Sequence, residues 1–97
     1  MNNRVKADLI EEFMPRAVEI ALEMNDGSLP AEDLTQEAYL GLVTGIEAIA
    51  RAEEADEYDR LPLEETVEEA IRMQVKAALE AEAPIILLPV GTLLPLM

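Results

Sequence analysis

Apolar residues recur at intervals of three and four over most of the chain, which is the spacing of an amphipathic helix. In the first such stretch, roughly residues 3–24, the pattern falls on Ile10, Phe13, Met14, Ala17, Val18, Ala21 and Met24. Pro15 lies inside this stretch and lacks the amide proton that an interior turn requires. We therefore expect the helix to kink at Pro15 or to restart there as a second helix.

A loop signal, Asn25-Asp26-Gly27-Ser28, separates this stretch from the next one. Pro30 is expected near the first turn of the second stretch, where Glu32 and Asp33 complement the helix dipole, and the helix is predicted to run to about Ala55. When residues are placed at steps of about 100°, one arc of this helix collects apolar and small residues. These residues are Leu34, Ala38, Gly41, Leu42, Gly45 and Ile49, and the pattern predicts that they are buried against another helix.

The opposite arc of the same helix is mainly polar but contains two sizeable apolar side chains. It carries Asp33, Gln36, Glu37, Leu40, Val43, Thr44 and Glu47. An apolar patch with a polar rim suits a protein partner. Two other interpretations stay open: Leu40 and Val43 are ordinary exposed apolar residues, or a neighbouring helix covers them.

A third helical stretch follows a loop at about residues 56–63, which contains Pro62. Its apolar positions are Val67, Ala70, Ile71, Val75, Ala78 and Leu79. The helix is predicted to reach about Glu82 and to be ended by Pro84. These patterns predict an all-α fold, a small bundle of three to four helices over residues 1–83.

Residues 84–97 are uncharged and contain Pro84, Pro89, Gly91 and Pro95, so we expect an extended apolar tail and not a long helix. An apolar tail must cover an apolar surface. That surface belongs to its own bundle, or to a second copy in a homodimer formed through residues 85–97. A third alternative is that these residues belong to a following domain.

Charge and composition narrow the class of function. The 97 residues include 21 acidic and 7 basic side chains, for a net charge of −14, which disfavours direct binding of nucleic acid and favours a basic partner. Acidic runs are also common as plain solvated helix faces. The chain has no histidine and no cysteine, so we expect no enzyme, no metal site and no cofactor. Without a leader or an apolar run of about 18–20 residues, a cytoplasmic protein is expected.

The segment Asp33-Leu34-Thr35-Gln36-Glu37-Ala38, followed by Gly41-Leu42, resembles the core-binding segment of region 2 of bacterial sigma factors, whose pattern is D-L-x-Q-E-G-x-x-G-L. Leu9 to Met24 resembles the preceding helix of that family, residues 27–30 match its connecting loop, and the likeness extends over about residues 7–82. Ala38 replaces the usual glycine. The resemblance implies docking on the β′ clamp helices of RNA polymerase core, with Asp33, Gln36 and Glu37 as contact residues and Leu40 and Val43 beside them.

The third stretch departs from that family. The family helix that melts promoter DNA resembles F-S-T-Y-A-x-W-W-I-R, whereas Leu63 to Arg72 reads LEETVEEAIR here. Unstacked bases need aromatic faces and phosphates need positive charge, but residues 47–82 hold 12 acidic and 4 basic side chains. We therefore expect binding to polymerase without promoter melting. The alternatives are a homo-oligomeric helical interaction domain and an acidic binder of a basic regulator that keeps only the fold.

Overall fold

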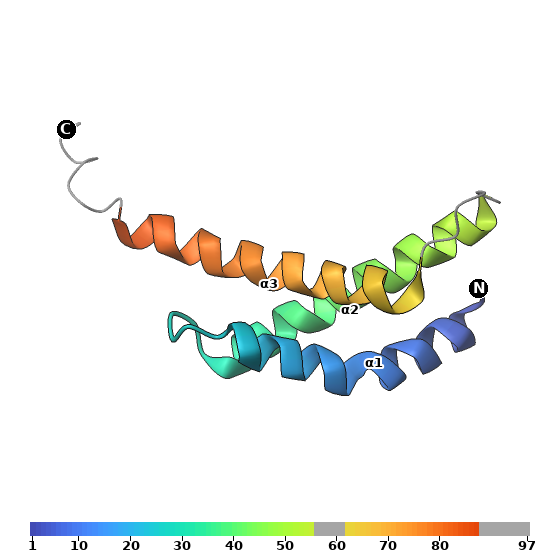
Figure 1. Cartoon of the computed structure of the whole chain (residues 1–97), viewed down its shortest axis with the longest axis horizontal. Coiled ribbons are helices and arrows are strands. Elements are labelled where there is room, and N and C mark those ends of the chain that lie inside the picture. Colours follow the sequence, from blue (N-terminus) through green and yellow to red (C-terminus); the bar gives the residue numbers. More distant parts are fainter. Residues whose placement is uncertain (56–61, 88–97) are drawn as a thin grey trace.

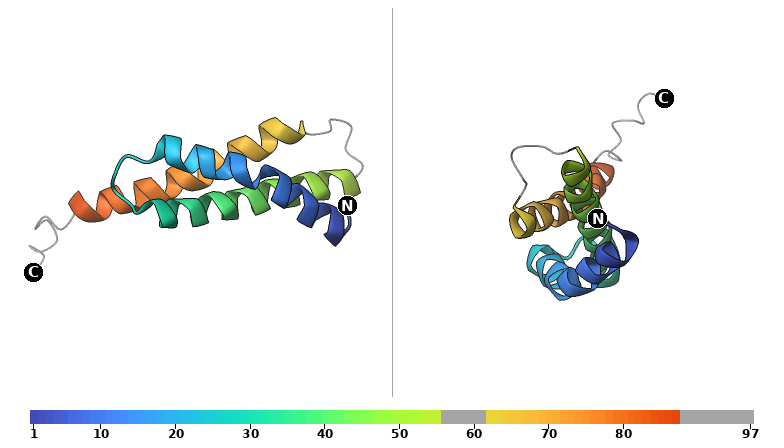
Figure 2. Two further views of the ribbon diagram at one scale, coloured as in Figure 1. Left: turned by 90° about the horizontal axis from the view of Figure 1, so that it is seen from below. Right: turned by 90° about the vertical axis from the view of Figure 1, so that its right-hand side faces the viewer.

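The computed structural model describes residues 1–55 and 62–87, and within them it contains three α-helices and no strand. They are α1 (Asn3–Met24), α2 (Ala31–Glu54) and α3 (Leu63–Leu87). Figure 1 shows the three helices lying lengthwise beside one another, and Figure 2 gives the same bundle from two further sides. The central element is α2, which packs extensively on both α1 and α3, while α1 and α3 meet over a smaller area. The predicted all-α bundle is confirmed.

Helix α1 begins at a side-chain cap, because Oδ1 of Asn2 accepts a hydrogen bond of 2.8 Å from the amide of Val5. Pro15 lies inside α1 without splitting it. The ribbon bends near its middle but continues as one helix (Figure 1). A proline removes one intrahelical hydrogen bond, and the packing of the following turns on α2 and α3 holds the helix together. The fourth helix that the sequence allowed is therefore not formed.

The turn between α1 and α2 is built by side chains that bond to their own backbone. Oδ1 of Asn25 accepts from the amide of Gly27 at 2.8 Å, and Oδ1 of Asp26 accepts from the amide of Ser28 at 2.9 Å. Gly27 has φ of 91°, which a residue without Cβ adopts at little cost. Pro30 stands just before the first residue of α2, and its carbonyl accepts from the amides of Asp33 and Leu34.

The core lies among the three helices, and each of them contributes buried apolar side chains. All six residues predicted for the inner arc of α2 are buried, which confirms that face. The largest fully buried side chains are Ile20, Leu34, Leu42, Ile46, Val67, Ile71 and Val75. Helix α3 approaches α2 so closely that a Cβ added to Gly41 would lie 2.7 Å from Cα of Ile71. The small residues of α2 therefore set the spacing of the two helices.

Two expectations about the core and the helix ends need correction. Ile20 is fully buried in α1 although it was not among the predicted apolar positions, whereas Met14 and Val18 are only partly buried. The prediction that Pro84 ends the third helix is wrong, because α3 continues to Leu87. Residues 84–87 thus extend the helix and are not part of an extended tail. The remaining predicted tail, residues 88–97, lies outside the described residues.

Candidate functional site

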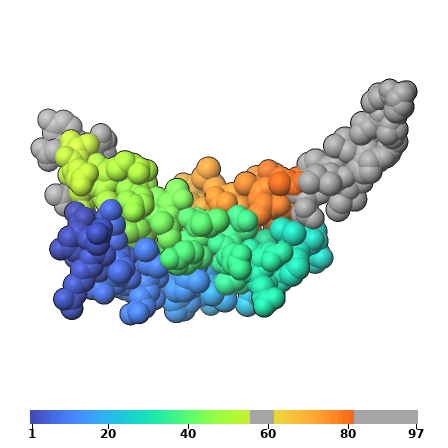
Figure 3. Space-filling model, turned by 180° about the vertical axis from the view of Figure 1, so that it is seen from behind, coloured from blue at the N-terminus to red at the C-terminus, as the bar shows by residue number. Residues whose placement is uncertain are grey.

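The predicted partner-binding residues lie along the outward side of α2. Asp33, Gln36 and Leu40 are exposed, and Leu40 keeps 50% of its surface accessible. Val43 and Glu37 are partly buried. We call these five residues the α2 outer face. Figure 3 shows α2, in green to teal, crossing one side of the molecule next to α1, in blue. Leu40 is not covered by a neighbouring helix, which removes one of the alternative interpretations for this side chain.

Glu37 differs from the other members of the outer face because it is tied to α3. Nε2 of Gln74 donates a hydrogen bond of 2.7 Å to Oε1 of Glu37, and both side chains are partly buried. A carboxylate accepts at two oxygens, so the bond to Oε1 leaves acceptor capacity at Oε2. Glu37 stays a predicted contact residue, and its side chain is held at the seam between α2 and α3.

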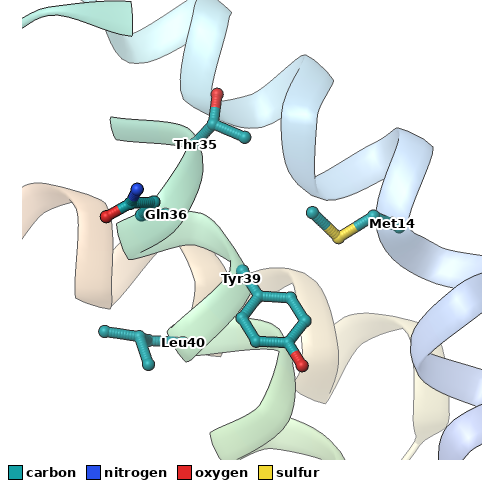
Figure 4. A pocket seen from close by; sticks show the side chains of 5 residues that line it. All are labelled: Met14, Thr35, Gln36, Tyr39 and Leu40. Atoms are coloured by element: carbon teal, nitrogen blue, oxygen red, sulfur yellow. The ribbon is translucent and has the colours of Figure 1, made fainter. Parts of the chain in front are cut away.

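A shallow apolar hollow lies beside the outer face, between α1 and α2. It has a volume of about 360 Å³ and is lined by Met14, Thr35, Gln36, Tyr39 and Leu40. In the view of Figure 4, the Tyr39 ring lies between the side chains of Met14 and Leu40. We call this feature the α1/α2 hollow. It shares Gln36 and Leu40 with the outer face, so one ligand can contact both.

Tyr39 and Met14 were not predicted as site residues. Tyr39 is 42% exposed and follows Gln36 by three positions, so it lies on the neighbouring strip of the helix surface. That spacing, together with the aromatic side chain, is the signal in the sequence that marks Tyr39 as a candidate site residue. Met14 was assigned to the core face of α1, and the structure places it at the edge of the core, where it lines the hollow.

On α3, the acidic block faces outward and is partly paired with arginine. Glu64, Glu65 and Glu69 are exposed. Glu68 accepts two hydrogen bonds from Arg16 of α1, from Nε at 3.1 Å and from Nη2 at 3.3 Å. Arg72 adds a bond of 3.3 Å from Nη1 to the same carboxylate. Both arginines of this surface are therefore engaged by a glutamate.

The network extends to the last turns of α1. Arg16 also pairs with Glu19, and Glu23 lies 3.8 Å from Arg16 and 4.0 Å from Arg72. The hydrogen bond from Arg16 is the main reason why the pKa of the Glu68 carboxyl lies below its usual range. The same bond, followed by that to Glu19, raises the pKa of Arg16. This network links α1 to α3 next to the acidic block, and nothing in the sequence pattern pointed to it.

Other kinds of site find little support in the residues that the structure describes. Residues 1–55 and 62–87 contain no group of three or more acidic side chains arranged to hold a metal ion. Within the same ranges, no helix combines the length and apolar content that crossing a membrane requires.

Comparison with known families adds one decisive observation. The family model described as Sigma-70 region 2 matches residues 9–56, which include most of α1, the turn and all of α2. Residues 9–56 form a sigma-70 region 2-like domain. The α2 outer face and the α1/α2 hollow both lie inside the matched segment, whereas α3 lies beyond it. The match is thus shorter than the likeness over residues 7–82 that the sequence suggested. Curated proteins and solved structures gave no significant match.

The match over residues 9–56 supports a coarse function. Sigma-70 region 2 is a non-enzymatic domain of transcription factors, and it implies a sigma-factor-like role in transcription initiation with contact to RNA polymerase core. The chain presents a mixed polar and apolar surface on α2, within the matched residues, and an acidic, arginine-paired surface on α3, beyond them. These two surfaces call for different interpretations.

Proposed function

We propose that this domain binds RNA polymerase core through the α2 outer face, with the β′ clamp helices as its docking site, and that it does not itself melt promoter DNA. The observation that carries the proposal is the exposure of Asp33, Gln36 and Leu40 on one side of a helix that the sigma-70 region 2 model matches.

The chemistry of the outer face fits a helical partner that carries arginine. Asp33 and Glu37 offer carboxylate oxygens four positions apart, and Gln36 adds an amide that both donates and accepts. Carboxylates form their strongest hydrogen bonds with guanidinium groups, often in pairs. Leu40 supplies an apolar side chain that a partner can desolvate, as the centre of a protein interface requires.

The second half of the proposal rests on the surface of α3. The segment that aligns with the family's promoter-melting helix, residues 63–72, holds Glu64, Glu65, Glu68 and Glu69 and no aromatic residue. Arg16 and Arg72 are paired with Glu68 and so offer little positive charge to a phosphate. A melted strand needs stacking surfaces and cations. This domain is therefore a competitor of sigma factors, or an adaptor whose DNA contacts lie elsewhere.

The direct test is binding of the full chain to purified bacterial RNA polymerase core. The variant Gln36→Ala, Leu40→Asp removes two exposed side chains of the outer face and leaves the Gln74–Glu37 bond in place. Loss of two central interface contacts costs about 2–4 kcal/mol, so we expect binding to weaken about 30-fold or more. Met73→Asp is the matched control, because Met73 is 65% exposed on α3 and lies outside the outer face.

The outcomes separate the proposed function from its alternatives. Weaker binding in the double variant but not in Met73→Asp supports docking through α2, and displacement of a sigma factor then identifies a competitor. No binding of the wild type at micromolar concentration contradicts the proposal. Light scattering on the same samples tests the alternative of a homo-oligomeric domain, and binding to a basic peptide tests that of an acidic binder.

A further inference from the structure

We infer that the apolar segment Leu88 to Met97 docks in the α1/α2 hollow of its own chain and there shields part of the α2 outer face. The inference about self-docking stands on the hollow and the segment alone. Its consequence for polymerase rests on the proposed function.

The hollow has the character of a site for an apolar peptide. Its lining is almost wholly apolar and includes the sizeable side chains of Met14, Tyr39 and Leu40. Tyr39 and Leu40 keep 42% and 50% of their surfaces exposed. Two sizeable apolar side chains beside one hollow lose water favourably when an apolar segment covers them.

The position of α3 brings the segment to this hollow. Figures 1 and 2 show that the carboxyl end of α3 lies at the same end of the bundle as the turn before α2. From Ala31 to Leu40, α2 advances about 14 Å at 1.5 Å per residue. The ten residues that follow Leu87 span up to about 33 Å when extended. This extended length is more than twice the distance along α2 from Ala31 to Leu40.

The composition of the segment is complementary to an apolar hollow. Its sequence, LPVGTLLPLM, has no charged side chain, so none of its side chains is repelled by a chain of net charge −14. Pro89 and Pro95 fix their own φ angles and favour the polyproline conformation, which docks on apolar grooves that contain aromatic rings. Tyr39 provides such a ring. The charged segments of the chain meet none of these requirements.

Tethering makes even a weak contact effective. A segment joined to its site by a short linker has an effective concentration in the millimolar range. A contact whose dissociation constant is about 1 mM as a free peptide would then be occupied about half of the time. Because Gln36 and Leu40 belong both to the hollow and to the outer face, occupancy lowers the fraction of molecules that can bind polymerase.

The test uses the full chain, which contains no cysteine, so that the variant Thr92→Cys can be spin-labelled at one position only. The NMR signals of Thr35 and Tyr39 are then compared with those of Arg51, which lies at the far end of α2. Self-docking predicts broadening at Thr35 and Tyr39 and none at Arg51. The matched control adds Leu93→Ser and Leu94→Ser, which remove apolar contacts without adding charge, and should restore both signals.

Each outcome decides the inference. Broadening that is lost in the serine variant supports it. The absence of broadening, or equal broadening in the serine variant, overturns it. A mixture of spin-labelled and isotope-labelled chains adds a third result: broadening that occurs only between molecules overturns docking in cis and indicates exchange with a second copy.

Polymerase enters only in a separate measurement. If both proposals hold, the variant Leu93→Ser, Leu94→Ser binds polymerase core about twofold more tightly than the wild type, because about half of the wild-type molecules are blocked. If the NMR result is positive and neither protein binds polymerase, the proposed function fails and self-docking stands. If both proteins bind equally and the NMR result is negative, self-docking fails and the proposed function stands.

Discussion

Gln74 of α3 and Glu37 of α2 are joined by a hydrogen bond of 2.7 Å between Nε2 and Oε1. The two residues are 37 positions apart in the chain and meet at the seam of the two helices. The bond fixes the direction of a carboxylate that belongs to the α2 outer face. A residue of α3 therefore helps to orient the surface that we propose for polymerase, although α3 lies beyond the part matched to sigma-70 region 2.

The first prediction concerns this bond. Gln74→Ala removes the donor and leaves a partly buried carboxylate with one partner fewer, so the free energy of unfolding should fall by about 0.5–1.5 kcal/mol. Urea unfolding followed by circular dichroism measures the change. Gln36→Ala is the control, because Gln36 is an exposed glutamine of α2 and its loss should change stability by less than about 0.5 kcal/mol. Equal losses in the two variants would show that the bond contributes nothing.

The second prediction concerns the glycines that let α3 approach α2. A Cβ at Gly41 would lie 2.7 Å from Cα of Ile71 and 2.8 Å from the carbonyl oxygen of Ala70, and backbone atoms cannot move away singly. At Gly45, the nearest atoms are 3.1 Å away. Alanine gains about 1 kcal/mol over glycine in a helix interior, whereas overpacking costs about 1–3 kcal/mol.

At Gly41 the cost of overpacking exceeds the gain in helix propensity, so we expect Gly41→Ala to be clearly destabilising. At Gly45 the two effects nearly cancel, so we expect Gly45→Ala to be nearly neutral. Thermal unfolding of the two variants beside the wild type measures the order. If Gly41→Ala were as stable as the wild type, the helices would be able to separate at this point without loss.

The faces of the helices were predictable because burial follows the 3.6-residue period. Leu34, Ala38 and Leu42 illustrate this: each was assigned to the buried arc and each is fully buried. The outcome at the prolines was not predictable in the same way. Pro15 and Pro84 both lie within helices, although neither has the amide that would donate a hydrogen bond to the preceding turn.

The site was predictable only where one helix determines it. Asp33, Gln36 and Leu40 share a side of α2 by periodicity alone, and their exposure agrees with the prediction, while their role as partner contacts remains a proposal. Contacts between helices were missed. Glu37 with Gln74 and Arg16 with Glu68 pair residues that are far apart in sequence, and a single sequence contains no local signal for such pairs.

The third prediction concerns the pH dependence of stability. Because Arg16 lowers the pKa of Glu68 in the folded chain, Glu68 stabilises the fold at pH values above its pKa in the unfolded chain, about 4.3. Glu68 loses this stabilising contribution as the pH falls from its pKa in the unfolded chain through its lower pKa in the folded chain. We expect wild type to exceed Glu68→Gln in stability at pH 7 by at most about 1 kcal/mol, since the pair is partly exposed.

Urea unfolding at pH 7 and at successively lower pH checks this expectation. The difference between the two proteins should shrink below about pH 4 and should also decrease in high salt, which screens exposed ion pairs. Glu64→Gln is the control, because Glu64 is exposed and belongs to no ion pair among the described residues. A difference that grows toward acidic pH would contradict the assignment.

The fourth prediction concerns nucleic acid. The wild type should not retain single-stranded DNA at about 0.1 M salt, because exposed Glu64, Glu65 and Glu69 repel phosphates and Glu68 occupies Arg16. The triple variant Glu64→Lys, Glu65→Lys, Glu69→Lys changes the charge of this surface by +6 and leaves the Glu68 network intact. We expect it to bind single-stranded DNA weakly and without sequence preference, with an affinity that decreases with salt by a slope of about −0.7 per phosphate contacted.

Fluorescence anisotropy of a labelled oligonucleotide measures this binding, and a variant with three reversals at exposed positions of α1, Asp8→Lys, Glu11→Lys and Glu12→Lys, changes the net charge equally. If only the α3 variant gains binding, the acidic block is what separates this domain from a DNA-melting one, because the same helix accepts a strand once its charge is reversed. If both variants gain equally, net charge alone excludes DNA. Retention of single-stranded DNA by the wild type would contradict the proposed absence of promoter melting, because the acidic surface of α3 would then tolerate a phosphate backbone.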